Sequence, residues 1–242
     1  MISADPEESL VLIRDELHVR IITLNRPEKR NALNAPLTRR LIAALEAARS
    51  EPDVHCIVLE GAGPSFCAGQ DLAEMASNKA AAEKLSVIPQ TRKLHGLLRD
   101  TQKPLLAAVR GGALGGGAAL MLGCDIVVAG HSLRFGYPEV PKGIFPGIVV
   151  ASLVRHIGPK LAFEMIARGK ILDANQAVEV GLVNQLVDDD RVETSAAELA
   201  RELAAHRPDL IAEVKRLFYR VGEIPYDEAL DAGFELARKR RG

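Results

Sequence analysis

The chain has 242 residues, 48% of them hydrophobic, which is enough to bury a sizeable core in one domain or in one domain with a small appendage. Its 31 basic and 32 acidic side chains nearly cancel, so charge gives no reason to expect a nucleic acid or an anionic membrane as the main partner. A small-molecule ligand is the better expectation.

The N-terminal segment and the most apolar region show no targeting or membrane signal. Residues 1–8 are acidic and lack the basic and apolar parts of a secretion signal, so we expect a cytoplasmic protein. Residues 104–130 are apolar but are interrupted by Arg110, Asp125 and several glycines, and no stretch reaches the roughly 20 residues needed to cross a bilayer. The three cysteines are odd in number and have no CxxC spacing, which predicts buried thiols rather than a disulfide framework or a metal site.

The first part of the chain alternates between strand-like and helical patterns. Residues 19–24 and 54–59 are typical of buried strands, and leucines recur between them at helical spacing behind Asn34, a helix-capping residue. The pattern continues with a helix carrying Leu94, Leu97 and Leu98, a strand at 105–109, a short helix at 116–122 and a strand at 125–129. This alternation predicts an α/β architecture with parallel strand pairing.

After Pro146 the pattern is mostly helical. Pro159 and Gly169 mark the two ends of one expected helix, and residues 184–187 are a candidate lone strand. Amphipathic helices are then expected at 195–205, 210–221 and 226–240.

Two glycine-containing segments each follow a strand-like run and offer bare backbone amides at a turn. They are Phe66–Leu72, with the sequence FCAGQDL, and Gly111–Gly117, with the sequence GGALGGG. Glycine gives the main chain unusual conformations and lets a ligand come close, so N–H groups there can point at a reacting oxygen. The glycine spacing fits neither G-x-G-x-x-G nor a phosphate-binding loop. Taken alone, the glycines are also compatible with tight helix–sheet packing and an ordinary loop.

Together with Asn25–Asn34 and Phe135–Glu139, these segments resemble the crotonase family, also called the enoyl-CoA hydratase/isomerase superfamily. The four motifs follow the family's order and spacing. The resemblance implies an α/β fold of ββα turns wound into a spiral core, residues 1–190, and a helical C-terminal trimerisation region, residues 191–242. It also implies a homotrimer or a dimer of trimers.

The resemblance implies an acyl-CoA thioester as the substrate. In the family two backbone N–H groups bind the thioester oxygen, and they match the amides of Gln70 and Gly116. The residues assigned on the same basis to coenzyme A are Lys29, Arg30, Ala32, Ala68, Gln70, Asp71 and Leu72. Lys29 and Arg30 would contact phosphates, with a solvated basic turn as the alternative. Coenzyme A is part of the substrate, so no separate cofactor and no metal are expected.

Family hydratases carry two glutamates that position and activate water, and this chain matches one of them. The later glutamate corresponds to Glu139, whereas Ala119 takes the place of the other. A methyl group cannot bind water or carry its proton, but one carboxylate can move a proton from C2 to C4 of a 3-enoyl thioester. This pattern is similar to the Δ3,Δ2-enoyl-CoA isomerases, so isomerisation with Glu139 as the base is the main hypothesis. Partial burial should raise the pKa of Glu139.

The residues leave several alternatives open. The same motifs are compatible with an enoyl-CoA hydratase of fatty-acid or related CoA metabolism, with a decarboxylase or hydrolase of CoA thioesters, and with a non-catalytic acyl-CoA-binding protein. His95 is either a second proton carrier or a partly exposed helix residue, and Tyr137 either lines the acyl pocket or packs as a ring. Asp71 is expected to orient its loop. The basic tail Arg238–Arg241 either reaches a phosphate of a neighbouring subunit or simply ends a helix.

Overall fold

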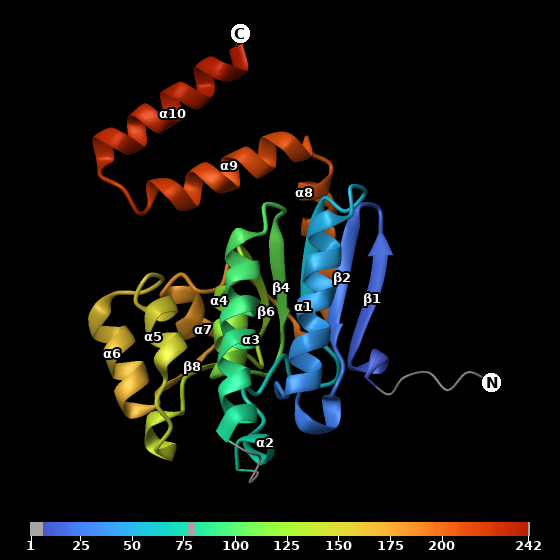
Figure 1. Ribbon diagram of the computed structural model, residues 1–242, viewed down its shortest axis with the longest axis vertical. Coiled ribbons are helices and arrows are strands. Elements are labelled where there is room, and N and C mark those ends of the chain that lie inside the picture. Colours follow the sequence, from blue (N-terminus) through green and yellow to red (C-terminus); the bar gives the residue numbers. More distant parts are fainter. Residues whose placement is uncertain (1–6, 77–80, 242) are drawn as a thin grey trace, which may run out of the picture.

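Within residues 7–76 and 81–241, which the computed structural model describes, a six-stranded sheet forms the centre of the fold (Figure 1). The strands are, in sheet order, β1 (Val11–Glu16), β2 (Val19–Leu24), β3 (Cys56–Gly61), β4 (Leu105–Val109), β6 (Ile126–Gly130) and β9 (Gln185–Val187). β1 and β2 pair antiparallel, and each later pair is parallel. The predicted α/β architecture with parallel pairing is confirmed, with an antiparallel edge strand, β1, in addition.

A second layer is built from short extended segments that follow the long strands. Leu33 bridges Gln70 in parallel, and Cys67 bridges Ala113 in the same way. The strands of this layer are β5 (Gly112–Leu114), β7 (Arg134–Gly136) and β8 (Ile171–Asp173). β5 and β7 pair in parallel, and β8 joins antiparallel to β7. The chain thus repeats long strand, short extended segment and helix, which is the ββα spiral that the resemblance implied.

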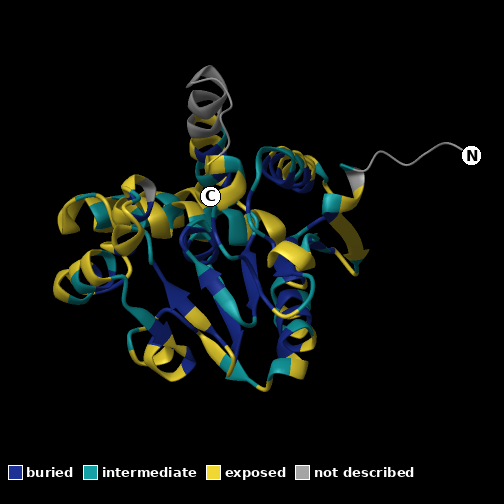
Figure 2. Cartoon of the chain, turned by 90° about the horizontal axis from the view of Figure 1, so that it is seen from below, coloured by how far each residue is buried: buried dark blue, intermediate teal, exposed yellow. Residues whose placement is uncertain are grey.

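The helices cover both faces of the central sheet. They are α1 (Ala35–Ser50), α2 (Leu72–Ala76), α3 (Ala81–Asp100), α4 (Gly116–Leu122), α5 (Gly147–Leu153), α6 (Pro159–Arg168), α7 (Ala174–Glu179), α8 (Val192–Ala204), α9 (Pro208–Val221) and α10 (Tyr226–Arg241). Short 3₁₀ turns lie at η1 (Glu8–Leu10), η2 (Pro27–Lys29), η3 (Val140–Lys142) and η4 (Asp189–Arg191). Burial is concentrated in the strands and on the helix faces that meet them (Figure 2).

α1 begins as its sequence predicts. The Asn34 side chain accepts a hydrogen bond from the Leu37 N–H at 3.0 Å and so satisfies one of the free donors of the first turn. Leu37, Leu41 and Leu45 are fully buried in the main core. The strand at 105–109 and the short helix at 116–122 also have the predicted bounds.

The structure adds strands that the sequence pattern did not reveal. Strand β1 is largely exposed on an edge, and β5, β7 and β8 have only three residues each, too few for an alternating pattern to be read. The expected lone strand is β9, which is not alone, because it pairs in parallel with β6.

The C-terminal helices divide into one that packs on the sheet and two that extend beyond it. Buried alanines of α8 contact strand residues such as Val19 and Cys56 in a second core cluster. α9 is attached through Asp125, which accepts from Lys215 Nζ at 2.6 Å and from the Tyr219 hydroxyl at 2.7 Å. α9 and α10 project away from the sheet as a pair (Figure 1). The division at residue 190 and the trimer contacts stay predictions.

The cysteine prediction is confirmed. Cys56, Cys67 and Cys124 are buried free thiols, and burial raises the pKa of Cys67 to about 12. Across the described residues, no group of three or more His, Cys, Asp or Glu side chains is arranged to hold a metal ion. None of the helices described combines the length and the low polarity that a membrane span requires.

The buried side chain of Asn31 ties the turn after β2 to the loop after β3. Its Nδ2 donates to the carbonyl oxygens of Ala62 at 2.9 Å and Ser65 at 2.7 Å, and its Oδ1 accepts from the Arg26 N–H at 2.8 Å. Asn31 has a φ of 55°, in the left-handed region that asparagine tolerates better than most residues.

We predict that Asn31→Ala lowers the free energy of unfolding by about 3 kcal/mol, because three main-chain groups lose their partner and alanine is strained at this φ. Asn25→Ala is the control, since Asn25 makes one exposed hydrogen bond to the Ser9 carbonyl, and about 1 kcal/mol or less is expected. Urea unfolding of both variants checks this. Equally small losses of unfolding free energy in the two variants would contradict the prediction.

Candidate active site

A cavity of about 690 Å³ lies at the start of α4. Its walls come from the first glycine-containing segment, from the second, from α2 and α3, and from the segment between residues 138 and 149. Gln70, Gly116 and Glu139, the three predicted catalytic residues, all line it, and so does Ala119. Segments far apart in the sequence therefore meet around one space.

The two glycine-containing segments lie directly against each other. The Cys67 N–H donates to the Gly112 carbonyl at 2.9 Å, and the Leu114 N–H donates to the Cys67 carbonyl at 3.0 Å. A Cβ added to Gly117 would lie 2.1 Å from that carbonyl oxygen, so only glycine fits there. A Cβ on Gly69 would lie 3.3 Å from the Gly116 nitrogen, which places the two turns within contact distance.

The amides of Gln70 and Gly116 are left without a partner in the described chain. Leu33 donates to the Gly69 carbonyl at 2.7 Å and accepts from the Asp71 N–H at 2.9 Å, so the intervening Gln70 N–H points to the other side. Gly116 is the first residue of α4, where an N–H has no carbonyl within the helix to bind. Two unpaired donors beside a cavity can hold an oxygen that gains negative charge.

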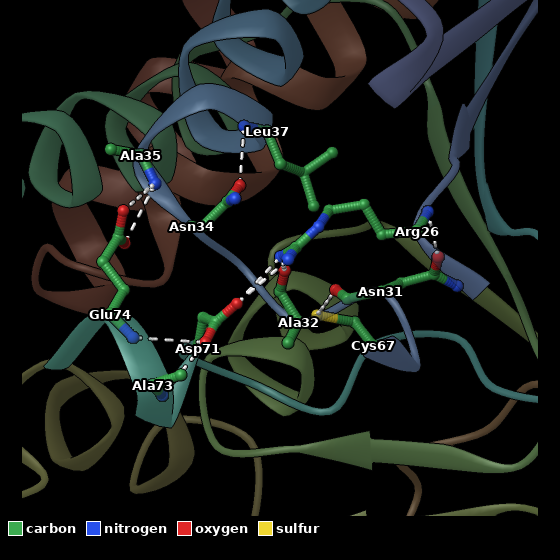
Figure 3. Close-up of polar contacts among 10 residues, drawn as sticks. All are labelled: Arg26, Asn31, Ala32, Asn34, Ala35, Leu37, Cys67, Asp71, Ala73 and Glu74. Carbon is green, nitrogen blue, oxygen red and sulfur yellow. Dashed lines mark hydrogen bonds and ion pairs between the residues drawn. The ribbon is translucent and has the colours of Figure 1, made fainter. Parts of the chain in front are cut away.

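A polar network holds the Gln70 turn in place (Figure 3). Asp71 pairs with Arg26 at 3.0 Å, and Arg26 also donates to the Ala32 carbonyl at 2.6 Å. The Asp71 carboxylate accepts from the Ala73 N–H at 3.0 Å at the start of α2. Burial opposes ionisation of Asp71, but the hydrogen bonds from Arg26 and the α2 backbone outweigh it and lower its pKa. Asp71 therefore orients the loop in this structure.

The residues assigned to coenzyme A divide into two groups. Ala68 and Leu72, like Gln70, line the cavity, whereas Lys29, Arg30, Ala32 and Asp71 lie outside its lining. Lys29 and Arg30 are exposed, and the Arg30 carbonyl accepts from the Ala68 N–H at 2.9 Å, which places this turn next to the cavity wall. A role in binding coenzyme A stays a prediction for all of them.

The Glu139 carboxylate lies beside the start of α4. Its Oε1 is 2.7 Å from the position that a Cβ on Gly115 would take, and Gly115 has a φ of 52°. Its Oε2 is buried and has no hydrogen-bond partner in the structure. Burial raises the pKa of Glu139, and the backbone N–H of Glu139 and the charge of Lys142 oppose this rise without cancelling it.

A second carboxylate in the described cavity lining, Glu74, is already engaged. Its two oxygens accept from the Ala35 N–H at 3.1 and 3.0 Å at the start of α1 (Figure 3). Ala119 contributes only a methyl group to the lining. Among the described residues of the lining, Glu139 is therefore the carboxylate that is available for proton transfer.

The other sequence candidates take different positions. His95 lines the cavity from α3. Tyr137 is fully buried outside the lining, and its ring packs edge-to-face on Phe135 at 5.6 Å, in agreement with the packed-ring interpretation. In the basic tail, Arg240 pairs with Asp209 at 3.1 Å and with Glu213.

Sequence reasoning missed several residues of the cavity wall. Gln90 and Thr91 line it from α3, and Glu74 lines it from α2. Thr91 and His95 are four residues apart, so their shared helix face is the signal that would have revealed this wall.

The chain is similar to known proteins over most of its length. The family model described as "Enoyl-CoA hydratase/isomerase" matches residues 15–238. The 2,3-dehydroadipyl-CoA hydratase of Escherichia coli (strain K12) is 39% identical over 96% of this chain and 88% of its own length. The short-chain-enoyl-CoA hydratase of Clostridium acetobutylicum is 33% identical over 91% of this chain and 85% of its own length.

Solved structures give the same result. The enoyl-CoA hydratase of Mycobacterium smegmatis superimposes with a TM-score of 0.89 at 31% identity, covering 95% of this chain and 90% of that one. The enoyl-CoA hydratase of Bacillus anthracis superimposes with a TM-score of 0.90 at 29% identity, covering 95% and 90%.

We predict that Glu139→Gln stabilises the fold at neutral pH and that this gain shrinks in acid. Because burial raises the pKa of Glu139 above its ordinary value of 4.5, the folded state holds the proton more tightly than the unfolded state. Ionised Glu139 therefore lowers stability above the folded-state pKa, and this cost disappears below about 4.5.

Thermal unfolding of both proteins between pH 4 and 8 checks this prediction. Glu179→Gln, at an exposed position on α7, is the matched control. A Glu139→Gln effect that is the same at every pH would contradict it.

Proposed function

The chain belongs to the enoyl-CoA hydratase/isomerase family, and from this premise we propose that it shifts the double bond of an enoyl-CoA thioester by proton transfer through Glu139. The observation that carries the proposal is one available carboxylate beside the Gly115–Gly116 turn, with Ala119 where family hydratases have a second glutamate.

The two unpaired amides supply the electrostatic part of the reaction. The thioester carbonyl oxygen accepts from the Gln70 and Gly116 N–H groups. When the C2 proton leaves, the electron pair of the C–H bond moves onto this oxygen through the conjugated dienolate, and both N–H groups stabilise the charge. Each such donor typically contributes on the order of 10²–10³ in rate.

Glu139 carries the proton. Its carboxylate takes the proton from C2, becomes a neutral acid and returns the proton to C4, so the double bond moves from C3–C4 to C2–C3 and no other reactant is needed. A buried carboxylate suits both halves of this cycle, because its raised pKa brings the acid and base forms closer in free energy.

Hydration is the second candidate, and the names of the relatives favour it. The Escherichia coli and Clostridium acetobutylicum proteins are both named hydratases. In that reaction Glu139 alone would position the water, since Ala119 cannot contact it through a hydrogen bond.

Binding of the rest of the substrate is part of the same proposal. Lys29 and Arg30 are exposed next to Ala68 and are assigned to the phosphates of coenzyme A. The assembly proposed is a homotrimer or a dimer of trimers, which light scattering would test.

We predict that the wild-type protein converts 3-enoyl-CoA to 2-enoyl-CoA, and that Glu139→Gln lowers this rate by about 10²–10⁴ because no base remains. Mass spectrometry and NMR of the products provide the measurement, with Glu179→Gln as the control. Formation of 3-hydroxyacyl-CoA from 2-enoyl-CoA, with no double-bond shift, would contradict isomerisation and support hydration. Binding without turnover would support a non-catalytic protein.

Two glycine substitutions, one in the site and one outside it, test the main-chain geometry separately. In Gly115→Ala the new Cβ would lie 2.7 Å from Glu139 Oε1, so the carboxylate and the adjacent amide must move, and we expect kcat/KM to fall by about 10²-fold.

Gly181→Ala is the matched control, because Gly181 also has a positive φ, 78°, but no heavy atom lies within 4 Å of the added Cβ. It should lose about 1 kcal/mol of stability and keep its kcat/KM. Similar activity in the two variants would contradict this prediction. Thermal unfolding and initial rates measure the two effects.

A further inference from the structure

The described part of the wall that α3 contributes to the cavity is polar. Over residues 89–100, the side chains of α3 that line the cavity are Gln90, Thr91 and His95, and none of them is apolar. The leucines of the same helix segment, such as Leu94 and Leu98, are buried in the main core instead. Over residues 89–100 the helix therefore gives polar side chains to the cavity.

Another wall is apolar. Residues 144–149 contribute Ile144, Phe145, Pro146 and Val149 to the lining. A purely hydrocarbon acyl group would match this side but would lie against unmatched hydrogen-bonding groups on the α3 side.

Two of the α3 side chains have unused hydrogen-bonding capacity. Gln90 Oε1 is shielded from solvent and has no hydrogen-bond partner in the structure. His95 is half-buried, and within the described chain neither of its ring nitrogens makes a hydrogen bond. A purely apolar ligand packed against these two side chains would leave them without hydrogen bonds, which costs binding free energy.

Resting on the proposed function, we propose that the acyl group of the preferred substrate carries an uncharged hydroxyl on the part remote from the thioester, held by Gln90 and His95. A hydroxyl donates one hydrogen bond and accepts others, so it can accept from the Gln90 side-chain N–H and donate to the unprotonated ring nitrogen of His95.

The charges around this wall favour a neutral group over a carboxylate. The cavity-lining side chains from residues 89–100 carry no permanent charge, and burial lowers the pKa of His95 below 6.5, which keeps its ring neutral at pH 7. Of the cations among the described lining residues, Arg39 is paired with Glu7 at 3.2 Å, and Lys142 lies close enough to Glu139 to affect its pKa.

Binding and turnover are measured separately with matched esters. Titration calorimetry uses the non-reacting hexanoyl-CoA, 6-hydroxyhexanoyl-CoA and adipyl-CoA, and kinetics uses 3-hexenoyl-CoA and 6-hydroxy-3-hexenoyl-CoA. We expect the hydroxylated ester to be preferred about tenfold or more in both measurements, because a site that binds a substrate hydroxyl discriminates against the analogue that lacks it.

Substitutions test whether the α3 side chains cause the preference for the hydroxylated ester. His95→Leu and Gln90→Leu should each remove most of the preference, whereas His95→Asn, which keeps a donor and an acceptor, should retain part of it. Arg92→Leu, at an exposed position on the same helix and outside the cavity lining, is the control and should keep the wild-type preference. Thermal unfolding shows whether each variant is folded.

The results distinguish failure of the hydroxyl proposal from failure of the proposed isomerisation. Equal binding of hexanoyl-CoA and 6-hydroxyhexanoyl-CoA, or a preference that survives both leucine variants, would overturn the hydroxyl proposal. Stronger binding of adipyl-CoA would show that a carboxylate is recognised instead. A hydroxyl preference in binding without any double-bond shift would support this inference and defeat isomerisation, and failure of all three esters to bind would overturn both.

Discussion

The direct contact between two main-chain turns is the constraint on which the site depends. The Cys67 carbonyl packs so closely against Gly117 that no side chain fits between them, and the neighbouring amides and carbonyls are hydrogen-bonded across the contact. Main-chain atoms in such a contact cannot move by changing a rotamer. The Gln70 and Gly116 N–H groups are therefore fixed relative to each other before any ligand arrives, which is what electrostatic preorganisation requires.

The surrounding polar groups keep this contact from shifting. Asn31 ties the turn before α1 to the loop that leads to Cys67, and the Arg26–Asp71 pair holds the residue after Gln70. Both links join positions more than 30 residues apart in the sequence, so they form only when the spiral has closed. The stability of the fold and the geometry of the cavity thus depend partly on the same side chains. Glu139 differs, because its buried carboxylate oxygen has no partner and the group is available for chemistry.

The sequence predicted the parts of this structure that are fixed by local chemistry. Leucines at helical spacing behind Asn34 specified α1, and an apolar run between breakers specified β4 with its correct bounds. The glycine-containing segments and Glu139 were found because their order matches a family pattern. The short strands β5, β7 and β8 were missed, since three residues carry too little pattern and their pairing is set by the layer beneath. Gln90 and Thr91 of the α3 wall were missed for a related reason: the leucines dominate the helix pattern, and only the packed helix shows that these two polar residues line the cavity beside His95.

The proposed oxygen-binding groups are backbone atoms, so side-chain substitutions do not remove them. Replacing the side chain of Gln70 leaves its backbone N–H in place. Alanine scanning therefore cannot detect the contribution of this donor. Only replacement of the peptide bond itself, for example by an ester linkage, removes the donor. The same property separates what a point substitution can change from what it cannot: the side chains of Ala119 and His95 can be exchanged one at a time, whereas the Gln70 N–H remains whichever side chain the residue carries.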